Sequence, residues 1–172
     1  RRRSFAGGIH PPERQHFSVD AAIEVMPTPK LIRIPLLQHL GAPCEAVVKP
    51  RTQVDLGDVL GEAKAFVAAP VHASAAGVTA RTSVATLPNG RHVSVVPIKT
   101  REQQPLSGRA LFEDVFGGQW PVDRVEQYEA QQIVEASRRA GLVGLGGAAF
   151  PTHVKLTRND QKPIRQLLIN GC

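Results

Sequence analysis

Short apolar runs separated by closely spaced turns limit what residues 30–100 of this chain can fold into. The first run, Lys30–Leu36, alternates so that Ile32, Ile34 and Leu36 share one face, as in a half-buried strand. The later runs cover residues 47–48, 54, 59–60, 65–67, 77–79, 84–87 and 93–98. The turn signals between them are Gly57-Asp58, Pro70 and Pro88-Asn89-Gly90. With 15 glycines and 14 prolines in 172 residues, this pattern predicts a compact barrel or sandwich.

The run that starts at Val54 is similar to a known small barrel. Val54-x-x-Gly57-Asp-Val-Leu-Gly-Glu62, followed by Ala69-Pro-Val and Gly77-Val78, resembles the lipoyl/biotinyl barrel-sandwich hybrid. Those domains carry a modified lysine at a hairpin tip, but that place falls here on Phe66 or Val67. Lys64 lies nearby without the expected flanking residues. We therefore expect an unmodified barrel. Pro50-Arg51-Thr52 replaces the usual Gly-Asp turn before Val54, which changes the expected turn but not the fold.

A helix is predicted before residue 141. Asp123 and Glu126 have the spacing of a capping box, and the basic residues 138–139 suit the negative end of a helix. Gly141 fits the position just beyond the helix end. The residues expected on its buried face are Ile133, Ala136 and Ala140.

The glycine-rich stretch Gly141–Lys155 follows this helix directly. It packs four glycines into seven residues and then continues Ala-Ala-Phe-Pro-Thr-His-Val-Lys. Glycines let a ligand approach the backbone, and a glycine loop that leads into a helix offers N–H groups to a phosphate. The spacing matches neither a dinucleotide fingerprint nor a P-loop. By spacing alone, a glycine-rich turn between packed elements remains an equal alternative.

Four motifs in order resemble one family. Gly144–Thr152 is similar to the Gly-x-Gly-Gly-Ala-Gly-Phe-Pro-Thr loop of the flavin- and NADH-binding subunit of respiratory complex I. The His-Val-Lys-Leu that follows makes the stretch most similar to the C-subunit of the Rnf (Rsx) electron-transport complex. The stretches Phe5–Glu13, Pro35–Pro43 and Ala69–Ser74 also resemble segments of that protein. The resemblance covers nearly the whole chain.

The resemblance implies an α+β fold, in which a β-rich barrel-sandwich hybrid precedes the start of an α/β flavin/NADH-binding domain like that of complex I. The prolines, glycines and apolar runs of the chain, taken with this resemblance, predict an extended arm at 1–29, the barrel at 30–100, a linker at 101–122 with a short helix near 110–116, and the truncated flavin domain at 123–172. The chain stops at Cys172 within that domain, so we interpret it as an N-terminal fragment.

The resemblance also assigns the cofactor-binding residues. Those implied for FMN and NAD(H) are Gly144, Gly146, Gly147, Ala148, Phe150, Lys155, Asn170 and Gly171. Lys155 would meet a phosphate, and Asn170-Gly171 would touch flavin at the end of a predicted buried strand, Leu167–Ile169. Ala149 stands where complex I relatives have glycine, so its methyl group either crowds the site or demands a different backbone angle.

By resemblance, the full protein is a peripheral electron-transfer subunit of a membrane-bound ferredoxin:NAD oxidoreductase, coupled to ion translocation at the cytoplasmic side of the cell membrane. It would be an enzyme subunit with FMN, NAD(H) and 4Fe-4S clusters, the clusters lying beyond Cys172. Its partners would be the other Rnf/Rsx membrane and iron–sulfur subunits, and ferredoxin indirectly. The fragment alone is expected to be inactive and to hold no cofactor. The alternatives are a non-catalytic docking module and a soluble flavin or cobalamin reductase.

Composition and spacing argue against other classes. The net charge is +6, and residues 1–3 supply half of it. The sequence lacks the stripe of basic residues that would indicate nucleic-acid binding. Cys44 and Cys172 lack metal or disulfide-framework spacing, and no histidine pair has zinc-site spacing, so no metal ligand is expected. No apolar run is long enough to span a membrane, so contact with it would come through partners. His72 and Ser74 lack an acid partner, so no catalytic residue is expected and the chemistry would belong to a cofactor.

Overall fold

The computed structural model describes residues 12, 14–22, 24, 26–106, 108–116, 126–145, 147–157 and 166. The elements are a 3-10 helix η1 (Gln15–Phe17), strands β1 (Leu31–Pro35), β2 (Glu45–Ala46), β3 (Gln53–Val54), β4 (Val59–Glu62), β5 (Val71–His72), β6 (Gly77–Thr79), β7 (Ser83–Thr86) and β8 (His92–Thr100), and helices α1 (Gly108–Phe116), α2 (Ala130–Arg139) and α3 (Thr152–Leu156). The predictions that concern Asp123, Gly146, Leu167–Ile169, Asn170 and Gly171 lie outside the described residues.

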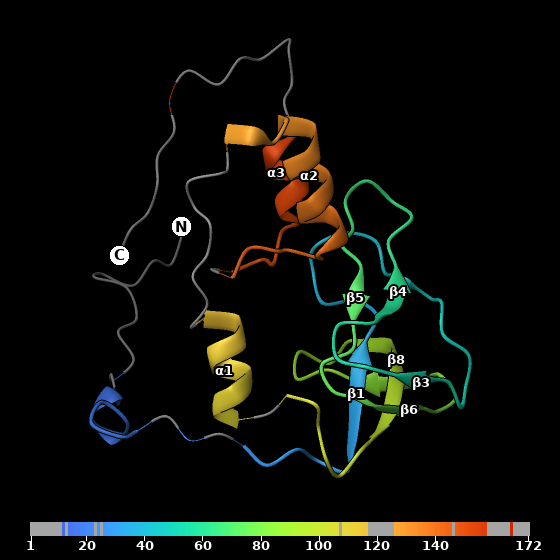
Figure 1. The fold of residues 1–172 in the computed structure, drawn as a ribbon, viewed down its shortest axis with the longest axis vertical. Helices are drawn as coiled ribbons and strands as arrows, with labels where there is room; N and C mark the ends of the chain where they lie inside the picture. Colours follow the sequence, from blue (N-terminus) through green and yellow to red (C-terminus); the bar gives the residue numbers. More distant parts are fainter. Residues whose placement is uncertain are drawn as a thin grey trace, which may run out of the picture.

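Two antiparallel sheets form the barrel at the lower right of Figure 1. The larger sheet has the order β1-β8-β6-β3, with β7 also paired to β8. The smaller sheet has the order β2-β4-β5. The long strand β8 joins three partners, because Val95 pairs with both Pro35 and Ser83, and Ile98 pairs with both Ile32 and Thr79. The predicted series of short strands is therefore confirmed as a strand-rich barrel, which matches the predicted fold class.

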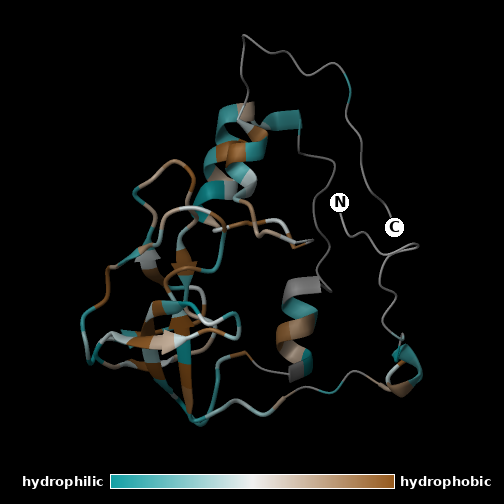
Figure 2. Ribbon diagram, turned by 180° about the vertical axis from the view of Figure 1, so that it is seen from behind, coloured by the Kyte–Doolittle hydropathy of each residue, from teal (hydrophilic) through white to brown (hydrophobic). Residues whose placement is uncertain are grey.

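The core between the sheets is made of small and branched side chains. Brown segments of the strands in Figure 2 mark their hydrophobic residues. Leu60 and Ile98 are completely buried. The other core residues are Ile34, Leu36, Cys44, Val54, Ala63, Ala68, Val71, Ala73 and Val96. A Cβ atom at Gly77 would lie 2.3 Å from the carbonyl oxygen of Lys99, so only glycine lets β6 and β8 pair this closely.

Two of the predicted strands are placed differently. The strand expected at residues 47–48 forms two residues earlier as β2, and residues 65–67 form a bend instead of a strand. The barrel tip, defined as residues 63–70, connects β4 to β5. Backbone carbonyls of this tip accept hydrogen bonds from α2 and α3 in place of a neighbouring strand. A run of apolar residues does not show whether the segment will pair with another strand or bond to helices, because the same run suits either partner.

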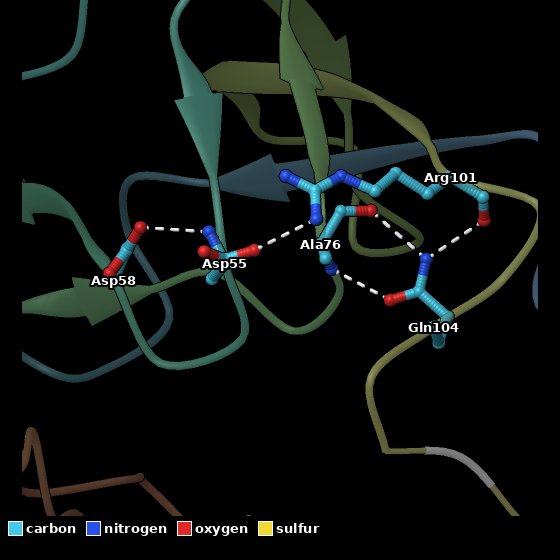
Figure 3. A network of polar contacts seen from close by, with 5 residues as sticks. All are labelled: Asp55, Asp58, Ala76, Arg101 and Gln104. Carbon is cyan, nitrogen blue, oxygen red and sulfur yellow. Dashed lines mark hydrogen bonds and ion pairs between the residues drawn. The ribbon is translucent and has the colours of Figure 1, made fainter.

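A polar network fixes the chain where it leaves β8 (Figure 3). The Gln104 amide donates to the carbonyl oxygens of Ala76 (3.0 Å) and Arg101 (2.9 Å) and accepts from the Ala76 N–H (2.8 Å). The Arg101 guanidinium lies 3.3 Å from the Asp55 carboxylate, and the Asp55 N–H donates to the carboxylate of Asp58. The helical turns predicted near 110–116 are present as α1. The described part of the arm before β1 contains one 3-10 turn, which the prolines did not indicate.

Helix α2 begins later than predicted. Glu129 and Gln132 form a reciprocal capping box, in which the Gln132 side chain accepts from the Glu129 N–H at 2.9 Å. The expected buried face is also wrong, because Ile133 is 37% exposed whereas Ser137 is buried. The small Ser137 faces the rest of the protein, and the neighbouring Arg138 bonds to the barrel tip. Arg138 and Arg139 do occupy the last turn, as predicted.

The barrel tip generates a first prediction. Lys64, the lysine nearest the carrier position, is paired with the Glu45 carboxylate at 2.6 Å, and the carbonyl of Phe66 at the carrier position itself is engaged by His153. We expect protein purified from its native host to have the unmodified mass in its barrel. Intact and peptide mass spectrometry measures this directly, and a lipoyl or biotinyl adduct on residues 30–100 would contradict it.

Candidate functional site

The glycine-rich stretch starts with a well-defined helix end. Gly141 has φ +66 and its N–H donates to the carbonyl of Arg138 at 3.0 Å. The N–H of Leu142 donates to the carbonyl of Ser137 at 3.1 Å. These two bonds form a Schellman motif, which confirms Gly141 in the predicted position beyond the helix. A Cβ atom there would also lie 2.5 Å from the carbonyl oxygen of Pro70, so glycine lets the helix end approach the barrel.

The loop that follows is closed by backbone hydrogen bonds. Val143 forms a bridge with Pro151, the Gly144 N–H donates to the carbonyl of Phe150 at 3.0 Å, and the Thr152 N–H donates to Leu142 at 2.9 Å. Two described residues between these pairs lie in open space: Leu145 is 98% exposed, and nothing lies within 4 Å of a Cβ placed at Gly147. The loop is therefore tied at its base and open at its end.

Lys155 returns from α3 to the base of this loop. A Cβ atom at Gly144 would lie 2.8 Å from Lys155 Nζ, so glycine at 144 provides the space that the lysine occupies. The same ammonium lies 6.0 Å from the centroid of the Phe150 ring, within range of a cation–π attraction. The structure thus brings together three of the predicted site residues, Gly144, Phe150 and Lys155. Gly147 and the exposed Ala148 lie further out on the loop.

Ala149 has a backbone angle that usually requires glycine, rather than the different angle that its substitution for glycine could have demanded. Its φ is +50, in the left-handed region that alanine rarely enters. Its carbonyl accepts a hydrogen bond from the Leu40 N–H of the barrel at 3.2 Å. A tertiary contact therefore accompanies the strained conformation.

The barrel and the loop are joined by side chains that sequence reasoning did not assign to the site. His153 is 1% exposed, and its Nε2 lies 2.9 Å from the carbonyl oxygen of Phe66. Arg138 Nη2 donates to the carbonyls of Ala63 (3.3 Å) and Ala65 (3.5 Å). His153 is therefore buried between α3 and the barrel tip. Arg138 was predicted only as a charge at the helix end, and no local pattern distinguishes it from Arg139.

A second histidine lies beside this contact. His39 Nε2 is 3.1 Å from the carbonyl oxygen of Ala42 and 3.2 Å from the backbone nitrogen of Ala69. A neutral ring can accept from the Ala69 N–H, whereas a charged ring can only donate to Ala42. Burial lowers the pKa of His39 below 6.5 and the nearby His153 adds to this, although the bond to Ala42 opposes it. The ring lines a cavity of about 170 Å³ together with His72.

The described residues give no sign of metal or thiol chemistry. Cys44 is buried, its thiol donates to the carbonyl of Ala69 at 3.0 Å, and burial raises its pKa, which makes it unreactive. Among the residues that the structure describes, no group of three or more His, Cys, Asp or Glu side chains could hold a metal ion. None of the described helices is long and apolar enough to cross a membrane.

Two protein-family models match separate parts of the chain. The model of the RnfC barrel sandwich hybrid domain matches residues 3–103. A second model, the Nuo51 FMN-binding domain, matches residues 137–172, which include the glycine loop.

Individual relatives match nearly the whole chain. The C-subunit of the ion-translocating oxidoreductase complex of Rhodobacter capsulatus is 36% identical over 98% of this chain and 31% of its own length. The C-subunit of the Na(+)-translocating ferredoxin:NAD(+) oxidoreductase complex of Acetobacterium woodii is 34% identical, over 98% of this chain and 36% of its own length. A proton-translocating counterpart from Clostridium ljungdahlii is 30% identical, over 99% and 35%. The chain therefore spans about a third of the length of these relatives.

The strain at Ala149 predicts the effect of a glycine. We expect Ala149→Gly to raise the free energy of unfolding by up to about 1 kcal/mol, because relief of the left-handed strain outweighs the added freedom of the unfolded chain. The neighbouring Ala148 has no positive φ, so Ala148→Gly should lower it by about 0.5–1 kcal/mol. Urea unfolding of both variants measures the difference, and equal losses would contradict the interpretation.

The lowered pKa of His39 predicts a pH dependence. Because the pKa of His39 is lower in the folded chain, the unfolded chain binds this proton at a higher pH than the folded chain does. The free energy of unfolding therefore falls as the pH falls below about 6.5. We expect His39→Gln to flatten the change in unfolding free energy between about pH 7.5 and pH 5.5. His92→Gln, at an exposed histidine, is the control for the loss of an imidazole elsewhere in the barrel. An unchanged slope in His39→Gln would show that this ring is not responsible.

Proposed function

Because this chain belongs to the family of Rnf electron-transport C-subunits, we propose that it is a peripheral electron-transfer subunit of a membrane-bound ferredoxin:NAD oxidoreductase that is coupled to ion translocation. The names of the relatives support this, since two of them are ferredoxin:NAD(+) oxidoreductase subunits. Other subunits of such a complex would be its partners, and they would hold it at the cytoplasmic side of the membrane.

The proposed site is the glycine loop, and its ligand is FMN. The observation that carries the proposal is the ammonium of Lys155 at the base of an open glycine loop, next to Phe150. The FMN-binding family model covers this same stretch. A phosphate needs a cation and free N–H groups, and an aromatic flavin ring needs apolar surface, which the exposed Leu145 offers. The described residues therefore fit one wall of a flavin site.

Each residue has a separate task in this proposal. Lys155 pairs with the phosphate, and Gly144 provides the room that lets its ammonium lie against the loop. Gly147 and Ala148 bring the open backbone close to the ligand, while Phe150 packs at the side. Gly146, Asn170 and Gly171 are assigned from the family resemblance. FMN when bound supplies the exchange between two-electron and one-electron transfer; NAD(H) and 4Fe-4S clusters belong to the same proposal for the full-length protein.

Removal of the Lys155 charge tests the proposal. In the full-length protein we expect Lys155→Ala to weaken FMN binding by about tenfold or more, because a charge-assisted contact with the phosphate is lost. Lys64→Ala is the matched control, since Lys64 is an exposed barrel lysine paired with Glu45. Quenching of flavin fluorescence in a titration gives both dissociation constants. Equal affinities of the two variants would refute the loop assignment, and no FMN binding by the unaltered protein would favour the docking-module alternative.

A further inference from the structure

The barrel tip offers its backbone carbonyls to the helices that flank the glycine loop. In Figure 1 the tip is the connection above β4 and β5, and it reaches toward α2 and α3. The carbonyls of Ala63 and Ala65 accept from Arg138 on α2, and the carbonyl of Phe66 lies 2.9 Å from Nε2 of His153 on α3. A carbonyl only accepts hydrogen bonds, so Nε2 of His153 bears the hydrogen.

His153 is enclosed at this contact. Its side chain is 1% exposed, and its ring stands perpendicular to that of Phe66 at a centroid distance of 5.9 Å. Its Nδ1 is buried and has no hydrogen-bond partner among the described residues. A buried nitrogen without a hydrogen-bond partner costs free energy. Packing around the ring and its single bond to Phe66 must offset this cost.

The glycine loop is fixed to the barrel at both of its ends. At the first end, Gly141 lies against the carbonyl of Pro70. At the second, the Leu40 N–H bonds to the carbonyl of Ala149, and His153 follows two residues after the buried Pro151. Between these points Leu145 is almost fully exposed. The barrel therefore determines where the loop starts and ends.

We infer that the barrel tip holds the glycine loop in its ligand-binding arrangement, and that His153, through its bond to the carbonyl of Phe66, is the positioning residue. Glycines lose more conformational freedom on ordering than any other residue, so a loop fixed beforehand binds its ligand more tightly. His153 itself touches no ligand in this arrangement. The identity of the ligand rests on the proposed function, whereas the contact between barrel and loop does not.

Four variants of the full-length protein separate positioning from general stability. His153→Leu keeps the bulk and removes the donor, whereas His153→Gln keeps an N–H that can reach Phe66. Arg138→Met removes the bonds to Ala63 and Ala65, and Arg139→Met changes the adjacent, exposed arginine as its control. If His153→Leu does not fold, the Arg138 pair still decides the question.

Hydrogen exchange without any ligand is the first measurement. We expect amides of residues 141–157 to exchange about tenfold faster in His153→Leu and Arg138→Met, because local opening becomes easier when the contact is lost. Amides of β8 should keep their rates, and His153→Gln and Arg139→Met should resemble the unaltered protein. Unchanged exchange of residues 141–157 in both His153→Leu and Arg138→Met would overturn the inference.

FMN titration of the same variants is the second measurement. The dissociation constant should rise about tenfold in His153→Leu and Arg138→Met and return to the original value in His153→Gln. Faster loop exchange with unchanged FMN affinity would overturn the positioning role, because the tip would then be only structural. If the unaltered protein binds no FMN, the proposed function fails, and hydrogen exchange alone supports or refutes the contact between tip and loop.

Discussion

The hydrogen bond between a buried imidazole of α3 and a backbone carbonyl of the barrel connects the two parts of this structure. His153 and Phe66 are far apart in the sequence, yet the geometry of the glycine loop depends on their contact. Arg138 strengthens the same junction from α2. A hydrogen bond of this kind has a fixed direction, so it determines orientation as well as proximity. Apolar packing alone would determine orientation less strictly.

The barrel can serve as a support because the pairing of its strands does not involve the tip. Strand β8 pairs with β1, β6 and β7, and small residues such as Gly77 let these strands approach closely. The connection between β4 and β5 takes no part in a strand ladder, and its carbonyls at Ala63, Ala65 and Phe66 accept from α2 and α3. A buried carbonyl needs a partner, and the two helices supply it. In this chain, the hairpin that carries a modified lysine in lipoyl-like domains is instead an internal contact.

The local chemistry of the site was readable from single residues and their neighbours. Gly141 beyond a helix, and Gly57-Asp58 and Pro88-Asn89-Gly90 in turns, follow from which residues tolerate positive φ. The positive φ of Ala149 did not, because alanine rarely adopts it. The alternating Ile32, Ile34 and Leu36 identified a strand, because strand periodicity is a property of the sequence itself. The capping box of α2 was misplaced, since more than one acidic residue near its start fits the pattern.

The sequence by itself determined the strand-rich barrel, the helix end at Gly141 and the glycine loop, because turn residues and apolar periodicity act over a few neighbouring positions. Only the tertiary structure decided that Ser137 and Arg138, rather than Ile133, face the protein, and that Phe66 meets His153. It also decided that the ammonium of Lys155 lies over Gly144. These contacts join residues on separate elements, and the helix periodicity of α2 is equally compatible with either face until the barrel tip supplies carbonyls on one side.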